Sequence, residues 1–127
     1  MKASANSINW FEISVADIAR AANFYEKIFN ITMDKQEMMG MHMAFFPWEN
    51  GSGKANGALV QGEMYVPSPD GVRLYLNGDP DLQVVLDRIP GAGGTIIMEK
   101  TAIGDGLGFM AFFIDSEGNV VGLHSNA

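Results

Sequence analysis

Five side chains of this sequence stand out because their types can support chemistry or ligand binding. Glu12 and His124 can serve as a general base, since a carboxylate and an imidazole can each accept a proton. Arg73 can stabilise a developing negative charge. Trp10 and Tyr75 can stack on a flat or apolar ligand while Glu12 and Arg73 hold its polar ends. The residue types therefore fit either a binding site or a metal-free catalytic site.

Strand periodicity predicts that these side chains line one hollow. Residues alternate between the two faces of a strand. In segment 8–15 the apolar set is Phe11, Ile13 and Val15, which leaves Trp10, Glu12 and Ser14 for the other face. The same reasoning selects Arg73, Tyr75 and Asn77 in segment 72–77, and Gly122 and His124 in the last strand. We expect Gly122 to leave room there. The alternative is that Glu12 and Arg73 pair with each other and His124 satisfies a backbone group, because buried charges need partners in any case.

Size and composition exclude several classes of function. The chain has 127 residues, 47% of them hydrophobic and 18% charged, which predicts a single folded domain, 1–127. A net charge of −7 argues against nucleic acid or a membrane surface as partner. The absence of cysteine excludes disulfides and thiolate chemistry. The polar start of the chain is not typical of a secretory signal, so we expect a cytoplasmic protein.

The elements that position these residues follow the order βαβββ, hinge, βαβββ. The first module, about 7–66, has predicted strands at 8–15, 31–38, 41–47 and 57–64 and a helix at 18–29 with Asp17 as its cap. The hinge is the turn sequence 67–71. The second module, about 71–126, has predicted strands at 72–77, 95–99, 108–114 and 119–124 and a helix that starts around 79–82 and ends at 91–94.

Two internal repeats indicate that one module was duplicated. Met43-Ala44-Phe45-Phe46 recurs as 110–113, and Asp17-Ile18 before the first helix matches 81–82 before the second. A βαβββ unit leaves an apolar sheet face uncovered, so the two copies are predicted to share a core.

The order and spacing of several phrases resemble one known superfamily. The phrases are 8–17, 21–29 with its central Phe-Tyr, the Gly-rich turn 91–94, the turn 112–119 with Ser116 in place of the usual Pro, and the ending 122–125. Together they resemble the vicinal oxygen chelate superfamily, which includes glyoxalases, bleomycin resistance proteins and extradiol dioxygenases. The resemblance implies an α+β fold of two βαβββ modules, with facing curved sheets around a cavity, helices outside, and a homodimer. Members of the superfamily include metal-dependent enzymes and proteins that only bind a drug, so the fold does not settle the function.

The metal ligands of the superfamily, carried over by position, fall on unsuitable residues. They fall on Trp10, Gln61, Arg73 and Gly122, of which only Gln61 offers a donor atom. If the alignment is shifted by two residues, Glu12 and His124 take two of these positions, but Tyr75 replaces Arg73. The result is again a poor set of metal ligands. The resemblance also adds Gln61 to the expected lining.

The sequence thus predicts a small-molecule-binding protein with no cofactor, metal-independent, of unknown ligand. The expected ligand-binding residues are Trp10, Glu12, Gln61, Arg73, Tyr75 and His124, with Glu12 and His124 as catalytic candidates. Two alternatives stay open: a metal-dependent lyase or isomerase of the glyoxalase type, and a dimeric structural or regulatory protein with no ligand.

Overall fold

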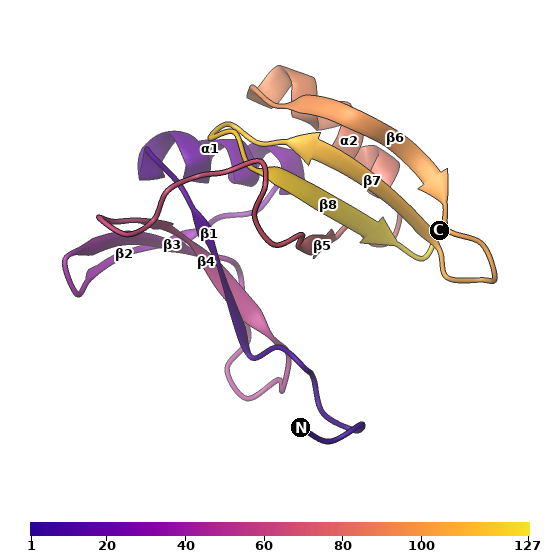
Figure 1. The fold of residues 1–127 in the computed structure, drawn as a ribbon, viewed down its shortest axis with the longest axis horizontal. Coiled ribbons are helices and arrows are strands. Elements are labelled where there is room, and N and C mark those ends of the chain that lie inside the picture. Colours follow the sequence, from indigo (N-terminus) through magenta and orange to yellow (C-terminus); the bar gives the residue numbers. More distant parts are fainter.

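The computed structural model describes all 127 residues and contains two βαβββ modules, as predicted (Figure 1). The first module comprises β1 (Trp10–Ser14), α1 (Ile18–Phe29), β2 (Asp34–Met38), β3 (Met41–Phe45) and β4 (Asn56–Gln61). The second comprises β5 (Tyr75–Asn77), α2 (Leu82–Ala92), β6 (Thr95–Ala102), β7 (Phe109–Ile114) and β8 (Val120–Ser125). The α+β class is confirmed.

Each module forms one four-stranded mixed sheet, and the two sheets have the same topology. The strand orders are β1-β4-β3-β2 and β5-β8-β7-β6. In each sheet the first strand of the module runs parallel to the last, and the remaining pairs are antiparallel. The identical topology of the two sheets supports the duplication inferred from the repeats.

Both helices begin and end on caps of the expected kind. The Asp17 carboxylate accepts a hydrogen bond from the Arg20 N–H at 3.1 Å, and Asn30 ends α1 in the left-handed conformation. The Asp81 carboxylate accepts from the Gln83 N–H at 2.9 Å, and Gly93 ends α2 at φ 103°. The expected helix start at 79–82 included Pro80, which lies directly before the cap Asp81 because α2 starts at Leu82.

Several strands differ in length from their predicted ranges. β5 begins at Tyr75, not at 72, because the segment before it follows the hinge and the Arg73 guanidinium bonds to the Pro69 carbonyl. β2 begins three residues later than predicted and β4 ends at Gln61. β6 continues to Ala102, and its pairing with β7 shifts register between Ile96 and Met98 and again between Met98 and Thr101.

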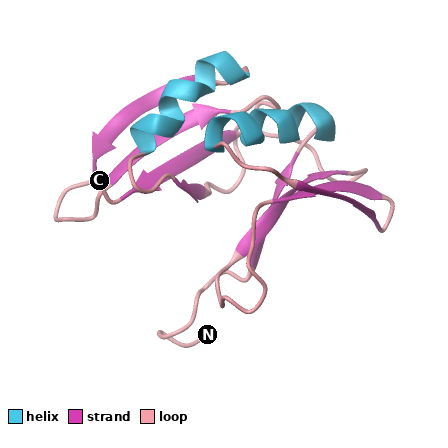
Figure 2. Cartoon of the chain, turned by 180° about the vertical axis from the view of Figure 1, so that it is seen from behind, coloured by secondary structure: helices cyan, strands magenta, loops and turns pink.

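One hydrophobic core joins the two modules. The helices cover one face of each sheet and lie against each other (Figure 2). A cluster of 19 buried residues draws on both modules, with Phe24 and Leu59 from the first and Leu86 and Phe113 from the second. Burying a side chain of this size contributes about 1.5–3 kcal/mol. The prediction of a shared core is confirmed.

The sheet faces that the helices do not cover are here called the open faces. The exposed fraction of Trp10 on the first is 41%, and that of Tyr75 on the second is 49%. Within one chain these faces are therefore accessible to a ligand or to another chain. Neither helix is long and apolar enough to cross a membrane.

Candidate functional site

A tilted pair of aromatic rings lies on each open face. The ring centroids of Trp10 and Phe45 are 5.6 Å apart with planes inclined at 53°. Those of Tyr75 and Phe112 are 5.5 Å apart with planes inclined at 56°. Phe45 and Phe112 hold the same position in the repeated tetrapeptide. Each module therefore presents a tilted aromatic pair of similar geometry.

Strand register matches Phe45 with Phe112 but not their partners, since Trp10 pairs with Asn56, two residues before Ala58, and Tyr75 pairs with Gly122. Phe45 lies opposite Ala58 of β4, and Phe112 lies opposite Gly122 of β8. Tyr75 also pairs with Gly122, and a Cβ atom there would lie 2.8 Å from the Tyr75 ring. The expectation that Gly122 leaves room is therefore wrong, because the Tyr75 ring fills that space.

The Glu12 carboxylate is held in place on the first open face. Its Oε1 accepts a hydrogen bond from the Tyr65 hydroxyl at 2.7 Å, and its Oε2 accepts from the Trp10 indole N–H at 3.3 Å. The hydrogen bond to Glu12, together with desolvation and the charge of that carboxylate, raises the pKa of Tyr65. Glu12 thus presents an oriented negative charge beside the Trp10 ring.

A groove of about 620 Å³ lies next to this carboxylate on the first open face. Both tryptophans of the chain, Trp10 and Trp48, line it. The Trp48 indole N–H donates to the Lys54 carbonyl at 3.1 Å, which fixes the ring. The remaining lining residues are Thr32, Asp34, Gln36, Met38, Phe45, Phe46, Pro47 and Asn56. The volume lies within the range of small-molecule sites.

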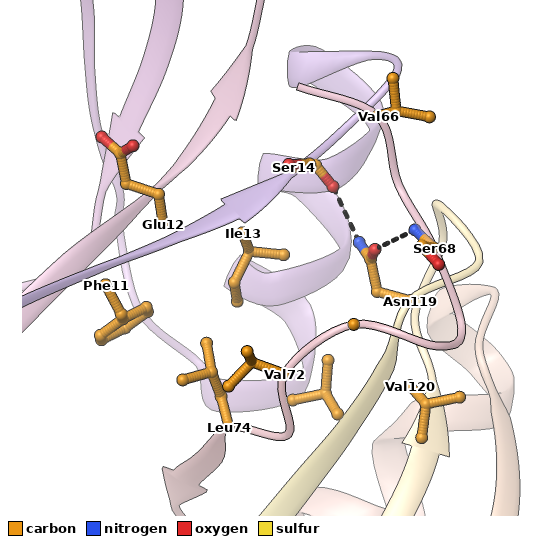
Figure 3. A pocket seen from close by; sticks show the side chains of 12 residues that line it. Phe11, Glu12, Ile13, Ser14, Val66, Ser68, Val72, Leu74, Asn119 and Val120 are labelled. Carbon is orange, nitrogen blue, oxygen red and sulfur yellow. Dashed lines mark hydrogen bonds between the residues drawn. The ribbon is translucent and has the colours of Figure 1, made fainter. Parts of the chain in front are cut away.

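A second pocket, of about 350 Å³, lies at the junction of the modules (Figure 3). It is lined by β1, by the segment between the modules and by the start of β8. Asn119 spans its wall: the side-chain amide donates to the Ser14 carbonyl at 2.8 Å and accepts from the Ser68 N–H at 2.9 Å. Of the six residues predicted to line a hollow, only Glu12 lines this pocket.

The structure separates the six predicted residues into four groups. Trp10 and Glu12 lie together on the first open face. Tyr75 lies on the second, and the pairing of β5 and β7 with β8 places His124 on the same face. Gln61 points to the helix side of its sheet, where its Oε1 accepts from the Ile18 N–H at 2.8 Å. Arg73 lies outside any strand.

The pairing proposed as an alternative for Glu12 and Arg73 is not formed. Arg73 donates to the Pro69 carbonyl at 2.7 Å, while Glu12 bonds to Tyr65 and Trp10. His124 does bond to a backbone group, since its Nε2 lies 2.7 Å from the Leu107 carbonyl oxygen. A carbonyl only accepts, so Nε2 carries the proton and Nδ1 is left as the basic nitrogen of the neutral ring.

The residues at the superfamily's ligand positions do not fit a metal ion within one chain. The Trp10 indole offers only an N–H, Gln61 faces the helix side, and Arg73 is cationic. In the register shifted by two residues, Glu12 and His124 lie on different sheets. No group of three or more His, Asp or Glu side chains is placed to share an ion.

Sequence reasoning missed the partners that complete these faces. Phe45 and Phe112 could have been found, because the repeat places them at matching positions in strands that neighbour the predicted ones. Tyr65, Trp48 and Asp34 carried no such signal. Tyr65 comes from the turn after β4, and its contact with Glu12 joins residues 53 positions apart.

Comparison with known proteins gives a consistent family assignment. The family model described as "Glyoxalase/Bleomycin resistance protein/Dioxygenase superfamily" matches residues 7–123. Two curated relatives, both named "Putative glyoxylase CFP32", come from Mycobacterium bovis and Mycobacterium tuberculosis. Each is 29% identical over 126 residues, which cover 91% of this chain and 44% of the relative. The chain thus spans less than half the length of these relatives.

Solved structures share the fold at low sequence identity. Hypothetical protein SA1046 from S. aureus has a TM-score of 0.66 at 18% identity, covering 96% of this chain and 95% of its own. TnmS3, an antibiotic binding protein from Streptomyces sp. CB03234, has a TM-score of 0.65 at 22% identity, covering 99% and 100%. An E144Q variant of glyoxalase I from Zea mays has a TM-score of 0.69 at 17% identity, covering 93% and 46%.

Proposed function

Since the chain belongs to the glyoxalase/bleomycin resistance protein/dioxygenase superfamily, we propose that it binds a flat small molecule on its open sheet faces. The observation that carries this proposal is that each open face has an aromatic contact of similar geometry, Trp10 with Phe45 and Tyr75 with Phe112. Large rings exposed on a rigid sheet offer apolar contact area at low entropic cost. That a solved protein of this fold is an antibiotic binding protein is in keeping with such a role.

Binding on these faces would not need a metal ion. The donors that a divalent cation requires are replaced at the superfamily's positions by an indole, a guanidinium and a glycine. Glu12 and His124, the two candidates for a general base, are engaged on separate sheets. These placements favour binding over catalysis. Metal analysis of the purified protein tests the metal-free part: a stoichiometric divalent ion that survives dialysis would contradict it.

A homodimer that covers part of the open faces belongs to the same proposal. Large apolar side chains are exposed around them, among them Met38, Met64, Val66, Val72 and Ile97. Monomers seldom leave apolar patches of this kind uncovered, and such patches often mark interfaces. Sedimentation equilibrium should give twice the 13.8 kDa mass of the chain. A monomer at all concentrations would contradict the dimer.

Titration with a flat tricyclic probe such as acridine tests the binding role directly. The melting temperature of the protein should rise with probe, since a ligand at a hundredfold excess over Kd stabilises by about 2.7 kcal/mol. Trp10→Ala and Tyr75→Ala should each weaken binding. Val84→Ala is the control, because Val84 is a half-exposed apolar residue on α2. Equal shifts in all four proteins would contradict the aromatic pairs as the site.

A further inference from the structure

The groove on the first open face combines aromatic side chains with a negative charge. We propose, resting on the binding function above, that this groove takes an aromatic cation. Trp10, Phe45 and Trp48 supply the aromatic surface, and Asp34 and Glu12 supply the negative charge. The chemical class of the ligand is thus a flat ring system that carries a permanent or protonated positive nitrogen.

Asp34 is the only charged residue among those that line the groove. It lies on β2 opposite Phe45, so its side chain is on the open face. Gln36 donates to Asp34 Oδ1 at 3.0 Å, while Oδ2 has no partner in the chain. One carboxylate oxygen therefore remains free for a donor or a positive charge on a ligand.

Glu12 adds a second carboxylate beside Trp10. Both of its oxygens accept hydrogen bonds, from Tyr65 and Trp10, so its charge is oriented instead of being free to turn away. No Lys or Arg lines the groove. The nearest cation in sequence to Asp34 is Lys35, which lies opposite the buried Ala44 and so belongs to the other face of the sheet. No cation that lines the groove compensates for the Asp34 carboxylate.

The aromatic rings strengthen the same preference. A cation over the face of tryptophan is attracted by about 0.5–1 kcal/mol at exposed sites and more when water is displaced. Trp48 is fixed by its hydrogen bond to the Lys54 carbonyl, and Trp10 by its bond to Glu12. The groove therefore offers two oriented indoles to a flat cation.

The second module provides an internal comparison. By strand register, Glu12 pairs with Ala58 opposite Phe45, and Tyr75 pairs with Gly122 opposite Phe112, so Glu12 corresponds to Tyr75. Asp34, which faces Phe45, corresponds to Met98, which faces Phe112. The positions of the two carboxylates, Glu12 and Asp34, are thus taken in the second module by the uncharged side chains of Tyr75 and Met98. The acidic face is a property of the first module alone.

Three probes with one ring system and three charges test the inference. N-methylacridinium is a cation, acridine is neutral and acridine-9-carboxylate is an anion at about pH 8. Binding is followed by calorimetry and by quenching of the fluorescence of Trp10 and Trp48, the only tryptophans in the chain. We expect Kd for the cation to be about tenfold lower than for acridine, with the anion weakest.

A matched pair of variants locates the charge effect. Asp34→Asn should bring the Kd of the cation close to the Kd of acridine measured with the same variant. Glu37→Gln removes the same charge from the same strand, but Glu37 is exposed on the other face, opposite His42, and should keep the full preference. Equal loss in both variants would assign the effect to net charge and overturn the proposal.

The outcomes also separate this inference from the function on which it rests. If acridine binds as tightly as N-methylacridinium to the unaltered protein, the cation preference is wrong while the binding of flat molecules stands. If none of the three probes binds at millimolar concentration, both proposals fall. If the cation binds best and Asp34→Asn removes that advantage, both are supported.

Discussion

Arg20 of the first module and Glu117 of the second form an ion pair across the molecule, with 2.7 Å between Nε and Oε2. The same carboxylate accepts from the backbone N–H groups of Ala16 and Asp17, each at 2.9 Å, just before α1 begins. Glu117 therefore binds the two backbone N–H groups that directly precede α1, a helix of the other module. This relationship ties the turn between β7 and β8 to the start of α1 and so helps to fix the two modules relative to each other.

The first prediction concerns acid stability. Burial opposes ionisation of Glu117, but the hydrogen bonds from Arg20, Asp17, Ser116 and Ala16 outweigh it and lower its pKa from 4.5 to about 2. Because this pKa is lower in the folded chain, the stabilisation is complete above about pH 4.5 and is lost as the pH falls towards 2. We expect Glu117→Gln to be less stable than the unaltered protein at neutral pH, by roughly 1–2 kcal/mol because Arg20 is solvent-exposed.

Urea denaturation at a series of pH values measures this effect. The difference in the free energy of unfolding between the two proteins should shrink as the pH falls below about 4.5. Glu37→Gln serves as the control, since Glu37 is exposed and makes no hydrogen bond through its side chain. A constant difference across the acid range would show that the charge of Glu117 does not carry the effect.

The second prediction concerns a buried hydroxyl. The Tyr25 hydroxyl donates to Asp115 Oδ2 at 2.7 Å, and Asn119 donates to the same oxygen at 3.0 Å. Burial, with the nearby Asp115 charge, raises the pKa of Tyr25 well above its usual range, so the hydroxyl stays a donor. Tyr25→Phe should cost about 1–3 kcal/mol, because the buried carboxylate loses a partner. Tyr75→Phe, at an exposed ring, should change the free energy of unfolding little.

The parts of the fold that sequence alone predicted are those set by local signals. The bounds of α1 follow from the apolar spacing between Ile18 and Phe29. Its caps, Asp17 and Asn30, directly precede and follow this segment in the sequence. The internal repeats predicted two modules with the same order of elements, because a repeat can be recognised in the sequence without knowing which strands pair. These features depend on neighbours within a few residues.

The site was less predictable because it depends on register and on distant partners. Gln61 entered the predicted lining by position, yet strand pairing puts it on the helix side with Ile18. Arg73 was assigned to a strand that starts only at Tyr75. Trp10 and Glu12 were placed on a shared face correctly, since alternation within one strand is enough for that. That Glu12 bonds to Tyr65 could not be read from either segment.

The third prediction uses the link between Glu12 and Tyr65. Their hydrogen bond, at 2.7 Å, raises the pKa of Tyr65. Glu12→Gln removes the negative charge and should lower the pKa of Tyr65 towards 10, its usual value. Carbon-13 NMR of labelled tyrosine Cζ resolves the three tyrosines in a pH titration. An unchanged Tyr65 titration would mean that Glu12 does not hold this hydroxyl in solution.

The last prediction tests whether the second aromatic pair depends on a glycine. A Cβ atom at Gly122 would lie 2.8 Å from Tyr75 Cδ1 and 3.1 Å from the Leu74 carbonyl oxygen, closer than atoms pack. Gly122→Ala should therefore displace the Tyr75 ring from Phe112 and cost about 1–3 kcal/mol. Ala58 lies opposite Phe45, at the position that matches Gly122, and already carries a methyl group. The first face therefore accommodates a methyl group at this position, whereas the second does not. Acridine should bind Gly122→Ala only through Trp10 and Phe45, and Trp10→Ala in that background should abolish binding. Full retention of binding by the double variant would show that neither pair holds the ligand.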